Sequence, residues 1–597
     1  MNKIWVTKQV NETIPDSLHP NPHIAKLLRQ RGVRTPEEAE RFFHPSLDHL
    51  YDPFMMKDMD KAVERIKRAV ADKEKICVYG DYDVDGITAV ALVYSFLEKI
   101  MQDPEDLGFF VPDRYLDGYG LSKRGIDYAY ENQVSLMIVL DCGIKANKEV
   151  LYAKEKGIDV IVCDHHLAEG EIPQAYAVLD PKREDCAYPC KELSGCGVGF
   201  KLVCAYCLQN GMSLRQYAYP LLDLTAMSIA SDIVPILGEN RVLSYYGLIL
   251  LNTMPRPGVK MLLQYANIHP YNPLKNRHRP APMAKGCQKP RFFDREITNN
   301  DLVFSLGPRL NAAGRVQDGK NAVRLLLCKD FASAEEMARL INENNATRKD
   351  LDHQATEEAL ELIKDHPEAA STIVFRDSWN QGIIGIVASR LIETYYRPTI
   401  VFTTTANGDK NMLVGSARSV KNFNIYDAIS ACGDLLEHYG GHKYAAGLTI
   451  KLENLEKFKA AFEKTVRESF NSEESQQEIE IDEELLFEDI TAELVATLKE
   501  FAPFGPLNPN PLFMSTHIKD AGDTKHVGSG KKHLKLSLFQ TKSRSYSING
   551  IAFQQGEALA EIKKGRSFDI CYHLEENTFN GNTAIQLNVK DIHFPDK

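Results

Sequence analysis

The sequence has 597 residues, of which 44% are hydrophobic and 26% are charged, and its formal net charge is −11 at pH 7. This length predicts roughly three or four domains, and the composition is typical of a globular protein that is soluble in water. The excess of acidic residues excludes DNA binding through overall positive charge. A polyanion would therefore need local basic patches or bound metal ions.

The sequence also bears on the location of the protein. No stretch approaches the roughly 20 apolar residues that a membrane helix needs. Residues 1–15 lack the apolar segment of a signal peptide. We therefore expect a cytoplasmic protein whose 12 cysteines are reduced.

The first half of the chain predicts an α/β domain. Residues 1–70 are expected to form a helical lead-in, with helices at 24–31, 36–43 and 59–71. From 71 to 255, short apolar runs alternate with segments of helical spacing, and strands are expected at 76–79, 136–140, 159–163 and 177–179. This alternation favours a doubly wound parallel sheet.

The first of these strands leads into three aspartates at alternate positions, Asp81, Asp83 and Asp85. Gly86 follows, and the residues after it have helical spacing, so the carboxylates lie between a strand and a helix. Open α/β sheets place their sites at this end of their strands. Carboxylates crowded this closely repel one another, which favours a role in holding hard cations such as Mg²⁺ or Mn²⁺.

Two other interpretations of this stretch compete with a catalytic cation site. Solvated acidic turns are common in proteins, but the segments on both sides of this one are apolar. A calcium-binding EF-hand loop also begins D-x-D-x-D-G, yet it needs a bidentate glutamate at its twelfth position. That position holds Leu92, and a strand rather than a helix precedes the loop.

Three more apolar segments end in groups that can bind metals. Two predicted strands end at Asp141 and at His165, and a further apolar segment, 222–231, ends at Asp232. We expect these endings to converge with the three aspartates on one edge of the sheet. Carboxylates with one imidazole suit a pair of Mn²⁺ ions better than a structural Zn²⁺, which favours thiolates.

Four further regions follow the sheet domain. They are predicted to be a basic insertion at 256–300, connecting helices with one long helix at 301–367, a second α/β domain at 368–468 and an OB-like β-barrel at 469–597. Two interpretations of the basic residues near 271–295 stay open. They form either a loop that touches DNA or a solvated surface segment.

The barrel prediction depends on five short β segments, near 512–519, 533–540, 545–553, 567–573 and 583–592. An acidic run at 473–489, typical of a linker, precedes them. OB-folds bind single strands by stacking bases on aromatic side chains. The candidates are Phe539, Tyr546, Phe553 and Tyr572, with Lys531, Lys532 and Lys535 for phosphates. We expect half of these aromatic residues to fill the barrel core instead.

The ordered motifs of the chain resemble those of the DHH phosphoesterase superfamily. They are GDYDVDG, VLDCG, DHH and IASDIVP, followed downstream by LGPRLNAAGR (306–315), WNQGIIGIVASRL (379–391), GSARS (415–419) and GGHKYAAG (440–447). The resemblance spans roughly residues 20–590 and is strongest to members that degrade single-stranded DNA from its 5′ end. It implies a DHH domain, a long connecting helix, a DHH-associated substrate-binding domain and a C-terminal OB-like domain.

The resemblance implies a role for each matching residue. The metal ligands would be Asp81, Asp83, Asp85, Asp141, His165 and Asp232. Asp83 would bind the first ion, Asp85 the second and Asp141 both. His166 would act with Asp141 in catalysis, beside the scissile phosphate. The substrate would contact Arg114, Arg309, Asn311, Arg315, Ser416, Arg418, Gly440, Gly441 and His442, with Arg114, Ser416 and Arg418 at the 5′-phosphate.

By this resemblance we expect a single-stranded-DNA-specific 5′→3′ exonuclease of DNA recombination and repair that uses two Mn²⁺ or Mg²⁺ ions. One alternative is a DHH phosphodiesterase that cleaves cyclic dinucleotides or short oligonucleotides. Another is a scaffold that binds DNA without cutting it. The resemblance also implies a monomer that works with a single-strand-binding protein and a helicase.

Overall fold

The computed structural model describes residues 3–10, 17–168, 170–273, 282–316, 318–366, 368–405, 409–470, 477–541, 543–579 and 582–595. The chain divides into two compact units. The larger unit contains residues 51–234 and 238–476, and the smaller one contains 1–50, 235–237 and 477–597.

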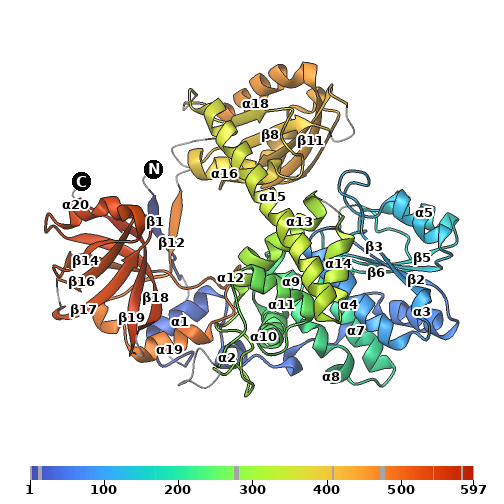
Figure 1. Ribbon diagram of the computed structural model, residues 1–597, viewed down its shortest axis with the longest axis horizontal. Coiled ribbons are helices and arrows are strands. Elements are labelled where there is room, and N and C mark those ends of the chain that lie inside the picture. Colours follow the sequence, from blue (N-terminus) through green and yellow to red (C-terminus); the bar gives the residue numbers. More distant parts are fainter. Residues whose placement is uncertain are drawn as a thin grey trace. The chain divides into compact units, whose positions relative to one another are not determined.

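A five-stranded parallel sheet organises the first half of the larger unit, in the order β3-β2-β4-β5-β6 (Figure 1). Its strands are β2 Ile76–Gly80, β3 Leu107–Phe110, β4 Leu136–Leu140, β5 Asp159–Cys163 and β6 Ala177–Leu179. The four predicted strands are confirmed, and the edge strand β3 is additional. Because β2 and β4 pair in register along their whole length, the residues that follow them leave the sheet side by side.

Helices cover both faces of this sheet. On one face, α5 (Lys123–Glu131) and α6 (Asn147–Glu155) bury Ile126 and Val150 against Val139 and other strand residues. On the other face lie α3 (Met59–Ala71), α4 (Val84–Ile100) and α7 (Gly195–Gln209). The α4 helix is apolar on nearly all sides because α7, α9 and α14 contact it in addition to the sheet.

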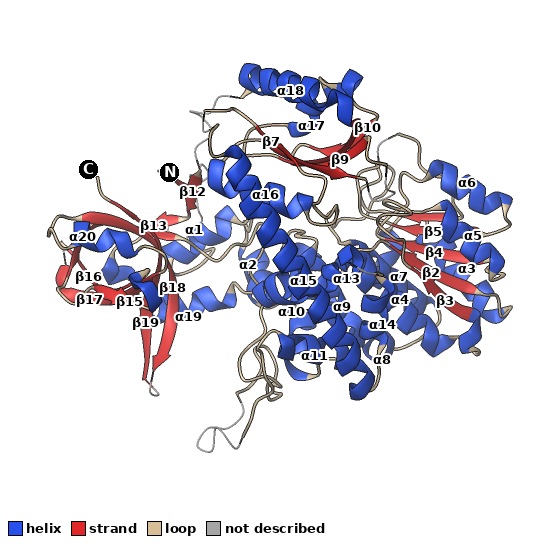
Figure 2. Ribbon diagram, turned by 45° about the horizontal axis from the view of Figure 1, so that its top comes forward, coloured by secondary structure: helices blue, strands red, loops and turns tan. Residues whose placement is uncertain are grey.

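A layer of helices follows on one side of the sheet (Figure 2). Its members are α8 Leu214–Tyr217, α9 Leu222–Ser231, α10 Gly238–Thr253, α11 Pro257–Tyr265, α12 Asn299–Asp301, α13 Gly307–Val316, α14 Lys320–Leu327 and α15 Phe331–Ile363. The expectation that residues 222–231 belong to the sheet is wrong. This segment is the helix α9, and it is apolar all round because α4, α7 and α10 enclose it.

The 33-residue helix α15 is the predicted long connecting helix, and it extends from α13 and α14 to the second α/β domain (Figure 1). The sheet of that domain has the order β10-β11-β9-β8-β7. Its elements are β7 Thr372–Phe375, α16 Ile384–Tyr395, β8 Thr399–Thr404, β9 Met412–Arg418, α17 Ile425–Ser430, β10 His438–His442, β11 Ala445–Lys451 and α18 Leu455–Ser469. The edge strand β10 was not predicted, because its exposed His-Tyr-Gly-Gly-His sequence has no buried alternate positions.

The smaller unit contains the predicted barrel. Its strands are β13 Glu483–Glu484, β14 Phe513–Asp520, β15 Lys525–Val527, β16 His533–Gln540, β17 Ser543–Ala552, β18 Phe568–Phe579 and β19 Asn582–His593. The five predicted strands are β14 and β16 to β19, and they close into a barrel through β14–β16 pairing. Two short helices, α19 Ala492–Glu500 and α20 Leu559–Ile562, complete the domain.

Both ends of the chain build this unit, which corrects two expectations. The helices α1 (Pro22–Gln30) and α2 (Pro36–Phe43) contribute Leu28 and Phe42 to the barrel core, so only the later part of the predicted lead-in belongs with the sheet domain. The strand β1 (Ile4–Thr7) pairs in parallel with β12 (Glu478–Ile481). The acidic run predicted as a linker is therefore partly a strand, while its residues 473–476 lie outside the described residues.

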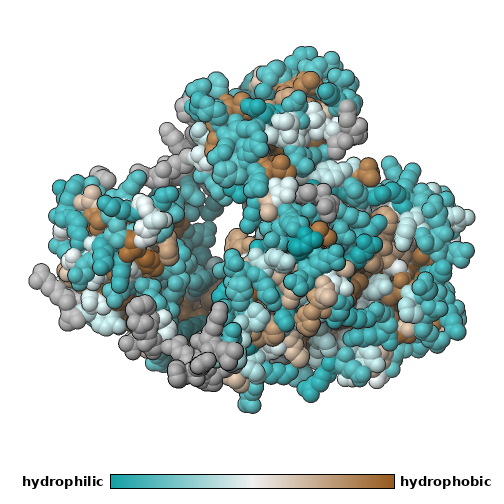
Figure 3. Space-filling model, in the orientation of Figure 1, coloured by the Kyte–Doolittle hydropathy of each residue, from teal (hydrophilic) through white to brown (hydrophobic). Residues whose placement is uncertain are grey.

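Part of the basic insertion is anchored to the larger unit. Residues 274–281 lie outside the described residues, but Phe293 is buried and the Phe292 N–H donates to the Asn252 carbonyl. In the view of Figure 3 the surface is mostly hydrophilic, with small hydrophobic patches. No described helix is long and apolar enough to span a bilayer.

Candidate metal centre

Carboxylates and one imidazole from five elements meet at the carboxyl edge of the parallel sheet. Asp81 follows β2, and Asp83 caps α4 by accepting hydrogen bonds from the Asp85 and Gly86 N–H groups. Asp141 follows β4 and His165 lies just after β5, while Asp232 caps the C-terminus of α9. Asp232 therefore reaches the group from a helix rather than from a strand.

His165 lies at the middle of this group. Its Nε2 atom is 3.2 Å from Asp141 Oδ1, 3.6 Å from Asp232 Oδ2 and 3.7 Å from Asp85 Oδ2. The ring is buried, yet neither ring nitrogen has a hydrogen-bond partner among the described residues. Burial lowers the pKa of His165, so the imidazole is neutral and can offer a lone pair.

Without a bound cation, the folded chain disfavours the ionised form of several of these carboxylates. Burial and then the neighbouring carboxylates raise the pKa of Asp141 and that of Asp81 well above the ordinary value. The same causes raise the pKa of Asp232 to about 8. One buried oxygen of Asp81, Oδ1, has no hydrogen-bond partner among the described residues.

This donor set fits hard divalent cations. Two overlapping groups of ligand atoms, Asp85–His165–Asp232 and Asp141–His165–His166, each lie within 4.8 Å of one another. Oxygen donors with a single imidazole suit Mn²⁺ or Mg²⁺. Unpartnered buried acceptors, together with carboxylates that repel one another, are the features that a bound cation would resolve.

Next to this centre, Asp164 holds His166 in a cationic state. Asp164 Oδ1 lies 2.7 Å from His166 Nδ1 and accepts from the backbone N–H groups of residues 165 and 166, and its Oδ2 accepts from the Ile144 N–H. Although burial opposes it, these contacts lower the pKa of Asp164 to about 2. Burial also opposes charge on His166, but the bond to Asp164 raises its pKa to about 9.

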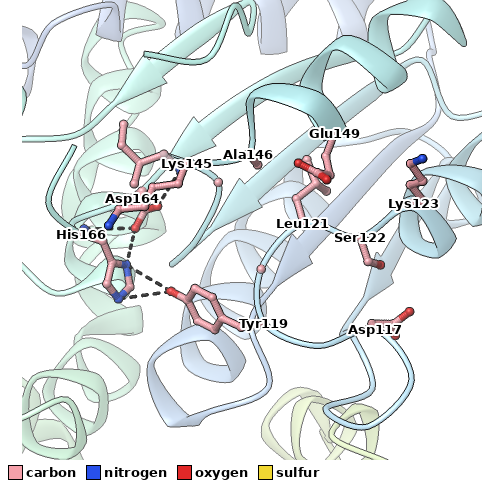
Figure 4. Close-up of a pocket in the computed structure, with 13 residues that line it drawn as sticks. Asp117, Tyr119, Leu121, Ser122, Lys123, Lys145, Ala146, Glu149, Asp164 and His166 are labelled. Carbon is pink, nitrogen blue, oxygen red and sulfur yellow. Dashed lines mark hydrogen bonds and ion pairs between the residues drawn. The ribbon is translucent and has the colours of Figure 1, made fainter. Parts of the chain in front are cut away.

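Tyr119 contacts the other side of the His166 ring, with its hydroxyl 3.2 Å from Nε2 (Figure 4). A cavity of about 420 Å³ lies beside these two side chains, and Lys123 and Lys145 line it as well. His166 thus carries a positive charge at an opening next to the carboxylates. An anionic oxygen in that opening would find a hydrogen-bond donor.

The backbone is in a left-handed conformation at two places in the centre. Asp141 has φ 60°, which an aspartate tolerates, and Ile233 has φ 60° directly after Asp232. For a β-branched residue this conformation costs roughly 1–3 kcal/mol, and such costs are typical of functional sites. Both residues redirect the chain where a carboxylate must point into the centre.

Arginines from several elements form a second charged cluster in the larger unit. Burial, followed by the charges of Arg114, Arg348 and Arg418, lowers the pKa of Arg315 to about 10. The Arg114 guanidinium lies 4.1 Å from the centroid of the Tyr82 ring, and its buried Nε has no partner among the described residues. Among the described residues no ion pair joins Arg114, Arg315 or Arg418 to a carboxylate, and positive groups that lie this close favour an anionic ligand.

Ser416 and Arg418 of β9 lie against the first turn of α16. Arg418 donates to the Ser416 hydroxyl at 3.1 Å. A Cβ atom on Gly385 would lie 2.8 Å from Arg418 Nη2 and 2.9 Å from Ser416 Oγ, so glycine permits this close approach. The cluster therefore combines guanidinium groups, a hydroxyl and a helix start, which are all phosphate-binding groups.

The other predicted substrate residues are more dispersed. The guanidinium of Arg309 donates to Asn342 Oδ1, to the Ser305 carbonyl and to the Tyr265 carbonyl, which gives it a structural role. Asn311 is half-buried on α13. Gly440, Gly441 and His442 are exposed on the edge strand β10. DNA contacts by these residues stay predictions.

The aromatic candidates of the barrel differ in how deeply they are buried. Tyr572 is fully buried in the core, and the Tyr546 hydroxyl donates to the Ile490 carbonyl. On β16 the alternate residues Lys535 and Phe539 point away from the buried ones, and Phe553 follows the end of the neighbouring β17 at 53% exposure. Only Tyr572 is therefore excluded from contact with a strand, because Tyr546 and Phe553 are exposed and Phe539 is half-buried. The predicted lysines Lys531, Lys532 and Lys535 are exposed as well.

Sequence reasoning missed several residues of the site. Asp164 was treated only as part of a motif, although its four hydrogen bonds organise the region of His166. Tyr119, Ser228 and Arg348 carry no sequence signal, because only the fold brings them to their partners. For Asp164 the order Asp-His-His is a usable signal, since a buried carboxylate beside two imidazoles needs partners.

Comparisons with known proteins agree with this architecture. The DHH family, N-terminal domain, matches residues 75–229, the DHHA1 domain matches 368–468, and the RecJ OB domain matches 481–591. The single-stranded-DNA-specific exonuclease RecJ of Escherichia coli is 32% identical over 98% of this chain and 98% of its own length. RecJ of Bacillus subtilis is 34% identical over 97% of this chain and 69% of its own.

The structure of RecJ from Thermus thermophilus in complex with Mn²⁺ superposes with a TM-score of 0.79 at 25% identity, covering 99% of this chain and 80% of that one. A parallel sheet with carboxylates at its carboxyl edge, joined to a DHHA1 domain, defines a protein of the DHH class. Within that class the added OB domain and the full-length similarity are decisive. The chain belongs to the RecJ family.

The Asp164–His166 pair generates the first prediction. In metal-free protein, His166 of the wild type should titrate near pH 9, whereas in Asp164→Asn its pKa should fall, because the bond to Asp164 is lost and burial still opposes the charge. NMR of ¹³C-labelled histidine, assigned with His166→Gln, measures this. Asp180→Asn, which removes a nearby buried carboxylate not bonded to His166, is the control.

The Asp164–His166 pair also predicts how the free energy of unfolding depends on pH. The contribution of His166 is fully present below pH 6.5 and is lost as the pH rises through about 9. The contribution of Asp164 is present above pH 3.8 and is lost as the pH falls through about 2. An unchanged His166 titration in Asp164→Asn would show that Asp164 does not hold the charge.

Proposed function

We propose that this protein is a metal-dependent exonuclease that hydrolyses the phosphodiester bonds of single-stranded DNA from the 5′ end, in recombination and repair. The observation that supports it best is the occurrence, within one unit, of the carboxylate–imidazole centre and the arginine cluster. The first suits the chemistry of phosphodiester cleavage, and the second suits recognition of a terminal phosphate. Relatives named as single-stranded-DNA-specific exonucleases match the whole chain.

In this proposal Asp81, Asp83, Asp85, Asp141, His165 and Asp232 would hold two Mn²⁺ or Mg²⁺ ions, with Asp141 as the ligand common to both. When bound, such ions would supply a hydroxide at neutral pH and neutralise charge on the phosphate. The residues of the chain orient this chemistry. The cationic His166 is held by Asp164 through Nδ1, so its Nε2–H, which faces the Tyr119 hydroxyl in the structure, would turn to an oxygen of the scissile phosphate as negative charge develops on it.

The arginine cluster is proposed to bind the 5′-phosphate. Arg114, Ser416 and Arg418 would contact its oxygens, and Arg315 would add positive charge while its own bond to the Gly382 carbonyl keeps it in place. A guanidinium offers paired donors that match a phosphate. The outward face of β16 and β17 would bind the strand elsewhere, by stacking and by charge.

The proposal also covers the location, the oligomeric state and the partners of the protein. We expect a cytoplasmic monomer that works with a single-strand-binding protein and a helicase. One rival is a phosphodiesterase of cyclic dinucleotides or short oligonucleotides, for which an OB domain has no evident use. The other rival is a non-catalytic scaffold, which would not need a complete set of candidate metal ligands.

An activity assay in Mn²⁺ tests this proposal. The wild type should degrade a long 5′-phosphorylated single strand to mononucleotides and leave a cyclic dinucleotide intact. Asp141→Ala should remove the cleavage, because it deletes the carboxylate nearest to His165. Turnover by Asp141→Ala above a few per cent of the wild type would contradict the assignment. An inactive wild type that still binds DNA would favour the scaffold.

Arg418→Ala tests recognition of the 5′-phosphate. The variant should lose roughly tenfold or more of kcat/KM on 5′-phosphorylated strands, since charge-assisted hydrogen bonds contribute about 1.5–3 kcal/mol. On 5′-hydroxyl strands it should resemble the wild type. Arg376→Ala, an exposed arginine of the same domain that pairs with Glu358, is the matched control. Equal losses on both substrates would rule out an end-reading role.

The exposed aromatic residues of the barrel predict a defect that depends on strand length. Phe539→Ala combined with Phe553→Ala removes two stacking platforms, each of which contributes ~1–3 kcal/mol per base. The ratio of kcat/KM for a long strand to that for a trinucleotide should therefore fall at least tenfold. Tyr130→Ala, an exposed tyrosine of α5, serves as the control. An unchanged ratio would mean that this face does not bind the strand.

A further inference from the structure

The carboxylate of Asp85 accepts three hydrogen bonds, two from backbone N–H groups and one from a hydroxyl. Its Oδ2 accepts from the Gly195 N–H at 2.7 Å, and its Oδ1 accepts from the Cys196 N–H at 2.7 Å. The Ser228 hydroxyl of α9 donates to the same Oδ1 at 2.8 Å. Asp85 is 1% exposed, so these three donors and the His165 side define its surroundings.

The three hydrogen bonds are divided unequally between the two oxygens of Asp85. A carboxylate oxygen offers about two lone pairs. Oδ1 accepts two hydrogen bonds, whereas Oδ2 accepts one and keeps more of its capacity to accept. Oδ2 is also the oxygen that lies 3.7 Å from His165 Nε2. The oxygen that can accept more is thus the one that belongs to the candidate metal centre.

Ser228 is itself held in position. Its Oγ lies 2.6 Å from Ser194 Oγ, and Ser194 caps α7 by accepting from the Gly197 N–H at 3.1 Å. The Ser228 hydroxyl faces two acceptors, Asp85 Oδ1 and Ser194 Oγ, and its single proton is drawn to the carboxylate, which is the stronger acceptor. Both serines are fully buried, which leaves the hydroxyl no other orientation to prefer.

The first turn of α7 also touches Asp141. A Cβ atom on Gly195 would lie 2.6 Å from Asp141 Cβ and 2.7 Å from Asp141 Oδ1. Any larger residue would move one of the two carboxylates. The same turn therefore bonds to Asp85 and sets the closest approach to Asp141.

We propose that Ser228 and the first turn of α7 form a positioning cradle that makes Asp85 a one-oxygen metal ligand through Oδ2. The inference depends on the metal centre of the proposed function, and it assigns residues that are not themselves ligands. With two of its three hydrogen bonds on Oδ1, the cradle would hold the carboxylate so that Oδ2 faces the candidate metal centre. Hydrogen-bond partners of ligating groups tune metal affinity in this way.

Mn²⁺ binding without DNA tests the cradle, with free Mn²⁺ counted by electron paramagnetic resonance. Ser228→Ala removes only one oxygen, and one of the two Mn²⁺ ions should bind about tenfold more weakly. Ser194→Ala should weaken the same ion less, because Ser228 keeps its bond to Asp85. Ser244→Ala, which removes a buried hydroxyl without a partner among the described residues, should stay within about twofold of the wild type.

The outcomes separate this inference from the proposed function. Wild-type Mn²⁺ affinity in Ser228→Ala would overturn the cradle alone. So would an equal loss in Ser244→Ala, because the effect would then come from general destabilisation. A wild-type protein that binds no Mn²⁺ would overturn the metal centre and the cradle together. Thermal unfolding of each variant in EDTA shows whether the fold is retained.

Discussion

Repulsion among buried carboxylates is the constraint on which the larger unit depends. Asp81, Asp85 and Asp141 are each 2% exposed or less. Asp81 and Asp141 follow the adjacent strands β2 and β4, and Asp85 lies in the first turn of α4. Bringing such charges together is unfavourable without compensation. The parallel sheet provides the proximity, because β2 and β4 end in register. The compensation comes from the amino ends of α4 and α7 and from the neutral His165, and it is completed by bound cations.

Hydrogen bonding, rather than burial, decides the charge of each acid at this edge. Asp141 and Asp164 follow neighbouring strands and are equally inaccessible to water. Burial and nearby carboxylates raise the pKa of Asp141, whereas four donors lower the pKa of Asp164 to about 2. One acid is therefore available to a cation, and the other is permanently ionised beside His166. The same residue type supplies both functions because the loops around it differ.

Most of the sheet could be predicted because strand alternation and length are local properties. The strands β2, β4, β5 and β6 are short apolar runs, each followed by a turn, and the acids after them share one edge by topology alone. The position of Asp232 was predicted wrongly, since the ten largely apolar residues before it are consistent with either a strand or an enclosed helix. The pairing of β1 with β12 and the contact of Ser228 with Asp85 link distant parts of the chain, and no local pattern encodes them.

The barrel is not a separable C-terminal domain, and this follows from its core. Leu28 and Phe42 pack with Leu494 and Phe501, and Arg31 donates to Asn508 Oδ1 and to the Pro509 carbonyl. Removing residues 477–597 would therefore expose apolar side chains of α1 and α2 and deprive the buried Arg31 guanidinium of two of its three acceptors, leaving only the Leu27 carbonyl. Such a protein would lose activity through aggregation as readily as through lost DNA binding. Single side chains on the outward face of β16 and β17 avoid this ambiguity, because their removal leaves the shared core intact.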